Sequence, residues 1–148
     1  MKRILFGLIL AVAVACMIGA ASQARVAAPP RSGALHVTKE CSQYNGTVGS
    51  FCTITSSNIN AIDPGMRVVY LAAPSGGVLN ADIVLSFEHG SAAYGHVVLN
   101  LATKQGHVTL AGGTGRFTWF HADAAVSVDS AGVWHWDGTY SFTPPGND

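Results

Sequence analysis

The sequence predicts an all-β protein, folded as a closed, antiparallel, eight-stranded up-and-down barrel. Beyond residue 25, no stretch has the three-and-four spacing of apolar residues that an amphipathic helix requires. About eight short runs instead combine β-branched or aromatic residues with alternating polarity, and glycine-rich turns separate them. Short turns favour pairing of consecutive strands, and closing the sheet removes its exposed edges.

The clearest expected strand covers residues 79–88, where every second residue is apolar: Leu79, Ala81, Ile83, Leu85 and Phe87. The positions between them are mostly polar, which is typical of a strand with one buried face. The other expected strands are residues 35–38, 51–55, 66–71, 96–101, 107–110, 124–128 and 133–142. An eight-stranded interior is either filled by side chains or holds one small ligand.

The first 24 residues have the features of a cleaved secretory signal peptide. Lys2 and Arg3 precede an apolar run over residues 4–18, and Ser22 and Ala24 stand where a signal peptidase reads small side chains. The apolar run is shorter than the roughly 18–20 residues of a membrane span, so we expect no stable span in the mature chain.

Residues 13–16 resemble a bacterial lipobox, so an alternative is a lipid anchor on Cys16. Otherwise we expect a secreted or periplasmic protein. A flexible N-terminal arm over residues 25–33 would precede a single barrel domain over residues 34–148.

Charge argues against a nucleic-acid partner. Loss of Lys2 and Arg3 with the signal peptide leaves six cationic residues against eight acidic ones, and the six form no basic stripe. Only 11% of the residues are charged, which suits a compact exported domain.

Cys41 and Cys52 remain after signal cleavage, and an even pair in an oxidising compartment predicts a disulfide. The glycines and asparagine between them favour a turn that brings the two ends together. Such a bond adds about 3 kcal/mol in the chain-entropy account. A redox pair is the alternative, but it usually has C-x-x-C spacing.

The segment "GGTGRF" over residues 112–117 raises the question of a phosphate-binding loop. It has no lysine after the glycines and no helix behind it, so it fits neither a P-loop nor a dinucleotide fingerprint. Glycine permits positive φ, and we expect a tight corner between strands that places Phe117 in the end of the barrel.

Together with "WHWDGTYSF" at 134–142 and "CSQYNGTVGSFCTITSSNINAI" at 41–62, this corner resembles the allene oxide cyclase-like and dirigent-like barrel group, including its bacterial secreted members. The resemblance covers roughly residues 36–143, although bulky residues at 119–121 replace the small ones of relatives. It implies an eight-stranded barrel with an apolar central cavity. Some relatives use this cavity to cyclise a fatty-acid epoxide, and others to orient phenoxy radicals. Their catalytic residues align with no position here, so the catalytic residues are unknown.

Two histidine–aspartate pairs, His121 with Asp123 and His135 with Asp137, each lie on one side of an expected strand. Adjacent strands would gather them into a Zn²⁺ site or an acid–base pair. The alternative is a polar outer face, and we favour it because the aromatic residues of 134–142 occupy the opposite face. We therefore expect no metal ion and no cofactor.

The predicted ligand-binding lining of the barrel consists of Phe87, Phe117, Trp134, Trp136 and Tyr140. The expected function is that of a secreted barrel protein which binds a small hydrophobic ligand. One alternative is a cyclase or isomerase acting on such a ligand. The second is a non-catalytic surface or interaction protein with a filled barrel, and oligomerisation is left open.

Overall fold

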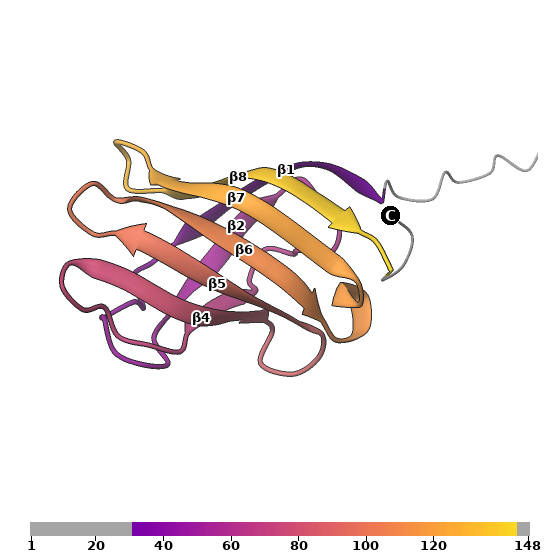
Figure 1. Ribbon diagram of the computed structural model, residues 1–148, viewed down its shortest axis with the longest axis horizontal. Helices are drawn as coiled ribbons and strands as arrows, with labels where there is room; N and C mark the ends of the chain where they lie inside the picture. Colours follow the sequence, from indigo (N-terminus) through magenta and orange to yellow (C-terminus); the bar gives the residue numbers. More distant parts are fainter. Residues whose placement is uncertain (1–30, 145–148) are drawn as a thin grey trace, which may run out of the picture.

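The computed structural model describes residues 31–144, and these form a closed barrel whose strands pair in chain order (Figure 1). All pairs are antiparallel, and β8 closes the barrel against β1. The strands are β1 (Ser32–Glu40), β2 (Phe51–Ser57), β3 (Arg67–Tyr70), β4 (Val78–Ser86), β5 (Ala92–Asn100), β6 (Gln105–Gly113), β7 (Phe120–Val128) and β8 (Trp134–Phe142). The predicted fold class and topology are confirmed.

The strand boundaries differ from the expected ones by up to four residues, most clearly at the starts of three strands. β1 begins at Ser32, inside the arm predicted over residues 25–33. β5 begins at Ala92, because a bulge between Ala93 and Gly95 lets pairing with β6 continue through this glycine-containing stretch. β7 begins at Phe120, because the corner before it is only a 3-10 turn, η1 (Gly115–Phe117). The predicted signal peptide and Cys16 lie outside the described residues.

Alternation of side chains builds the core. In β4 and β7 every second residue is buried, and the strands around them contribute aliphatic side chains to the same interior. Leu35, Val68 and Leu85 are among those without exposed surface, so neither solvent nor a water-sized void reaches them. The middle of the barrel is therefore filled by side chains. Among residues 31–144, no helix has the length and hydropathy needed to cross a membrane.

The two ends of the barrel differ. One end, here called the Phe117 end, carries η1 and the loops over residues 58–66, 87–91 and 114–119, and it lies at the right in Figure 1. The opposite end, here called the Lys39 end, carries the loops over residues 41–50, 71–77, 101–104 and 129–133.

At the Phe117 end, the glycine corner inserts an aromatic ring, as predicted. Gly115 has φ +56°, and a Cβ there would lie 2.1 Å from Ser91 Oγ, so any other residue would be strained and would displace the Ser91 side chain. The turn carries Phe117 into the barrel with no exposed surface, where its ring centroid is 5.4 Å from that of Phe120. Outside the corner, Arg116 pairs with Asp63 and ties it to the loop over residues 58–66.

Candidate functional site

The most unusual group in the interior is the side chain of Lys39. Leu35, Val37 and Lys39 share the inward face of β1, and the lysine is only 3% exposed. Its Nζ donates a 2.6 Å hydrogen bond to the Oη of Tyr70 on β3. Tyr70 Oη also lies 3.4 Å from Cys52 Sγ. A lysine rarely stays this deeply buried without a carboxylate, and within residues 31–144 Lys39 forms no ion pair.

Three aromatic rings surround the Lys39 amine. Its Nζ lies 5.1 Å from the ring centroid of Trp136, 5.4 Å from that of Tyr70 and 5.7 Å from that of Trp134. These distances allow cation–π attraction, which offsets part of the cost of desolvating an ammonium group. We call Lys39, Tyr44, Tyr70, Trp134 and Trp136 the lysine cluster.

Burial controls the protonation of the cluster. Desolvation lowers the pKa of Lys39 from its ordinary 10.5 to about 7. Burial also raises the pKa of Tyr70 and that of Tyr44, and for Tyr70 the neighbouring Tyr44 adds to the effect. Near neutral pH the cluster therefore holds two protonated phenols and an amine that is neutral in a large fraction of the molecules.

Two polar atoms of the cluster have no hydrogen-bond partner in the described part of the chain. They are the Nε1 of Trp136 and the Oη of Tyr44, and both are buried. A buried polar group without a partner costs roughly 1–3 kcal/mol, so such groups are uncommon and call for an explanation. Lys39 Nζ also has more N–H groups than the single acceptor Tyr70 can use. The cluster thus has an excess of donors over acceptors.

The loop over residues 41–50 covers this end of the barrel. The predicted disulfide is present, and the Cys41–Cys52 bond joins the end of β1 to β2 on either side of the loop. Hydrogen bonds between the loop backbone and Tyr70 hold it against β3: Gly49 N donates to Tyr70 O, and Tyr70 N donates to Ser50 O. Tyr44 reaches in from the loop, with its ring edge against Tyr70 at a centroid distance of 4.9 Å.

The structure separates the five residues predicted to line one ligand site. Trp136 and the half-buried Trp134 belong to the Lys39 end, whereas Phe117 and Tyr140 belong to the Phe117 end. Phe87 follows the last residue of β4 and is 38% exposed, so it lies at the margin of the Phe117 end and outside the buried core. Aliphatic side chains fill the barrel between the two aromatic groups.

Lys39, Tyr70 and Tyr44 are absent from the predicted lining. The signal for Lys39 is present in the sequence, since it continues the alternation of Leu35 and Val37. The charge of the side chain argues against the inward position that the alternation indicates. Tyr44 lies in a loop without periodicity, so no sequence pattern places it.

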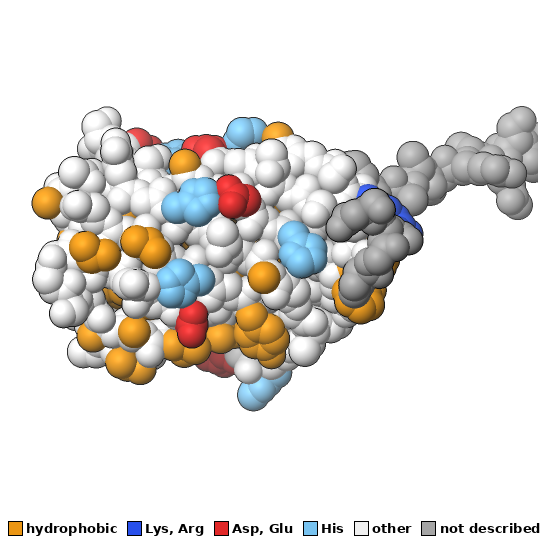
Figure 2. Space-filling view, in the orientation of Figure 1, with side chains coloured by type: hydrophobic (Ala, Val, Ile, Leu, Met, Phe, Trp, Pro, Cys, Tyr) orange, Lys and Arg blue, Asp and Glu red, His pale blue; other side chains and the backbone are white. Residues whose placement is uncertain are grey.

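The predicted polar outer face is confirmed for the histidines and aspartates of β7 and β8. Asp123 lies 3.0 Å from His107, Asp137 lies 2.8 Å from His36, and His135 lies 2.9 Å from Asp129. The two predicted pairs do not gather into one cluster. Within residues 31–144, no group of three or more metal-ligating side chains forms. Figure 2 shows histidines beside acidic side chains on the outer surface of the barrel.

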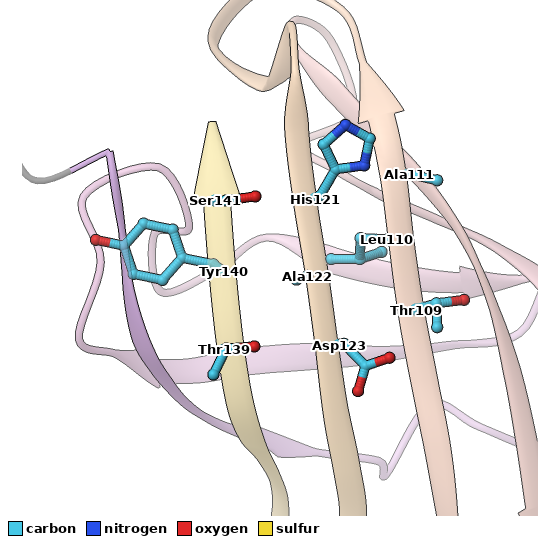
Figure 3. Close-up of a pocket in the computed structure, with 9 residues that line it drawn as sticks. All are labelled: Thr109, Leu110, Ala111, His121, Ala122, Asp123, Thr139, Tyr140 and Ser141. Atoms are coloured by element: carbon cyan, nitrogen blue, oxygen red, sulfur yellow. The ribbon is translucent and has the colours of Figure 1, made fainter. Parts of the chain in front are cut away.

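A shallow hollow of about 360 Å³ lies on the outside of β6, β7 and β8. Figure 3 shows His121 and Asp123 on the central strand, with Thr109 and Ala111 on one side and Thr139 and Ser141 on the other. Leu110, Ala122 and Tyr140 also border the hollow, although these three residues are buried. This hollow is separate from the lysine cluster, whose side chains point into the barrel.

Comparisons with protein-family models, with curated proteins and with solved structures found no match to this chain. The resemblance to the allene oxide cyclase-like and dirigent-like barrel group therefore stays a prediction. The chemistry that can be argued for the protein comes from the lysine cluster itself.

Proposed function

We propose that this is an exported binding protein, whose ligand is a small molecule with an apolar body and a hydrogen-bond-accepting oxygen, held at the Lys39 end. The observation that carries the proposal is the excess of buried donors in the lysine cluster. An oxygen acceptor from a ligand would supply the partner that the donors lack, and the aromatic rings would pack against its apolar body. The apolar N-terminal segment and the disulfide support export.

The packing restricts where such a ligand is held. Side chains fill the middle of the barrel, so we place the ligand at its end, under the loop over residues 41–50. Trp134 is half-buried and borders the cluster, and Tyr44 covers Tyr70 from the loop. Entry of the ligand requires Tyr44 to move aside, while the disulfide keeps both ends of the loop attached.

A filled barrel that acts only as an interaction protein is the second candidate, and the near-zero exposure of the mid-barrel side chains favours it. The cyclase or isomerase alternative rests on the family resemblance alone. A direct measurement of ligand binding distinguishes the binding protein from the filled-barrel interaction protein.

Tryptophan fluorescence offers a test, because two of the three tryptophans lie in the lysine cluster. Trp119 lies at the other end, so a Trp119→Phe background leaves only reporters of the site. Three probes share one apolar body: cyclohexane, cyclohexanone and cyclohexanecarboxylate. We expect saturable changes with the two oxygen-bearing probes and at least tenfold weaker binding of cyclohexane, because hydrogen bonds to a charged or polarised group contribute about 1.5–3 kcal/mol.

The variant Lys39→Met should remove the preference for oxygen-bearing probes, and Lys104→Met, in the exposed turn between β5 and β6, is the matched control. Absence of saturable binding for all three probes would refute the proposal and favour the filled-barrel candidate. An unchanged preference in Lys39→Met would also refute it.

A further inference from the structure

We propose that Lys39 forms a reversible imine with the carbonyl group of an aldehyde or ketone ligand, so that carbonyl compounds are the ligand class of the lysine cluster. This inference rests on the proposed function, because it needs a ligand at the Lys39 end. It goes further by assigning covalent chemistry to one atom, Nζ of Lys39, and by narrowing the oxygen-bearing group to a carbonyl.

The surroundings of the Lys39 amine favour its neutral form. A lysine attacks a carbonyl only as the neutral amine, and a hydrophobic enclosure is one known way to provide it. Aromatic rings surround Nζ, and no carboxylate of residues 31–144 holds it as an ammonium ion. The lowered pKa of Lys39 agrees with this geometry.

Tyr70 lies where it can transfer a proton beside Nζ of Lys39. Its Oη accepts the Lys39 hydrogen bond at 2.6 Å, and among residues 31–144 its own proton has only the disulfide sulfur of Cys52 as a partner, at 3.4 Å. Sulfur is a weak acceptor, so this proton can turn to a stronger acceptor beside Nζ. Because burial raises the pKa of Tyr70, the phenol keeps its proton at neutral pH and remains a donor.

The chemical step balances without any redox partner. The Nζ lone pair of Lys39 attacks the carbonyl carbon, and a proton passes from nitrogen to oxygen to give a carbinolamine. Tyr70 donates a proton to the departing hydroxyl group, the C–O bond breaks and one water leaves. The nitrogen lone pair forms the C=N bond, and loss of the remaining N–H proton to Tyr70 restores the phenol. The net change is amine plus carbonyl to imine plus water, and hydrolysis reverses it.

Packing at the Lys39 end does not require a lysine. The cluster is otherwise aromatic, and an apolar side chain such as methionine would fill the position without the cost of desolvating a charge. Perturbed ionisable groups in an enclosed setting are frequent at functional sites. The unpartnered N–H of Trp136 and O–H of Tyr44 belong to the same cluster and suit the oxygen of a bound carbonyl compound.

Reductive trapping tests the inference on the purified mature protein. Cyclohexanecarbaldehyde is the probe, sodium cyanoborohydride converts an imine to a stable secondary amine, and peptide mass mapping locates the adduct. Lys104 is the built-in comparison, because it is exposed whereas Lys39 is buried. An ordinary lysine is neutral in fewer than about one molecule in a thousand at pH 7, so we expect at least tenfold more adduct at Lys39.

Cyclohexanecarboxylate should protect Lys39 and leave the slow reaction of Lys104 unchanged. Tyr70→Phe should slow adduct formation at Lys39, with the exposed Tyr94→Phe as its control. Circular dichroism and thermal unfolding show whether each variant is folded. Adduct formation with equal rates at Lys39 and Lys104, or only at Lys104, would refute the imine.

The two proposals fail in distinguishable ways. If cyclohexanecarboxylate still binds while the aldehyde leaves Lys39 unmodified, the imine is refuted and the binding function stands. If neither probe reaches the Lys39 end, both proposals are refuted.

Discussion

The two ends of this barrel close the same kind of opening with different chemistry. At the Phe117 end, a glycine corner inserts Phe117 against Phe120, and Phe120 contacts Phe142 at a ring-centroid distance of 5.0 Å. At the Lys39 end, aromatic rings surround an amine, and two buried polar side chains find no hydrogen-bond partner among residues 31–144. Both ends are rich in aromatic residues, but in the described part of the chain only the Lys39 end holds buried side-chain atoms without a hydrogen-bond partner.

This difference separates packing from function. The Phe117 end satisfies its own requirements, because among the described residues none of its buried polar side-chain atoms lacks a partner and its exposed Arg116 pairs with Asp63. The Lys39 end does not satisfy its own requirements. Groups that reduce stability persist in proteins mainly where function requires them. We therefore propose that the Phe117 end serves stability and that the Lys39 end serves ligand binding.

The largest expected effect is on the Phe117 end. Phe117→Ala should lower the free energy of unfolding by about 3–5 kcal/mol, because it removes a fully buried ring from a packed core. Chemical denaturation measures the loss. The control is Trp119→Ala, two residues away. Because the Trp119 side chain is 46% exposed in the wild-type protein, this variant should lose much less free energy of unfolding. Similar losses for both variants would show that Phe117 does not close the barrel.

The second prediction concerns the pH dependence of stability at the Lys39 end. The pKa of Lys39 falls from 10.5 to about 7 on folding, so between these values the unfolded chain binds more protons than the folded one. Stability should therefore rise with pH across this window, with a slope approaching about 1.4 kcal/mol per pH unit. Above about pH 10, the raised pKa values of Tyr44 and Tyr70 act in the opposite direction.

Lys39→Met isolates the contribution of the amine. The variant should be more stable than the wild-type protein at pH 7, and its advantage should shrink toward pH 10, because only the wild-type chain gains stability there. Urea denaturation at a series of pH values measures both curves, and Lys104→Met should follow the wild-type curve. A constant difference between wild type and Lys39→Met across pH 7–10 would contradict the proposed burial of the amine.

The sequence was sufficient for the barrel because side chains on a strand alternate, and alternation survives in the residue order. It also predicted the glycine corner and the disulfide. The sequence did not show which inward residues belong to which end of the barrel. Alternation tells whether a side chain points inward, but not which residues of other strands lie at the same level along the barrel axis. Trp136 and Tyr140 share the inward face of β8, yet they belong to different ends.

Two particular residues show where sequence reasoning stops. Phe87 continues the alternation of β4, but β4 ends at Ser86, and periodicity does not indicate where hydrogen bonding between strands stops. Lys39 follows the alternation inward against the preference of its charge. Its burial depends on Tyr70, Trp134 and Trp136, which come together with it only when the barrel closes.

The smallest expected effect is on the Lys39 end, and it tests directly whether the two ends differ in their hydrogen bonding. Tyr44→Phe removes a buried hydroxyl group that has no partner among residues 31–144, so the free energy of unfolding should stay the same or rise by about 1 kcal/mol in the absence of ligand. Tyr94→Phe, which removes an exposed hydroxyl group, should change nothing and serves as the control. In the probe titrations the same Tyr44 variant should bind cyclohexanone more weakly. A loss of stability of 1 kcal/mol or more, by the usual cost of a broken hydrogen bond, would mean that the hydroxyl is already paired. The Lys39 end would then be as complete as the Phe117 end, and the argument for a ligand there would lose its basis.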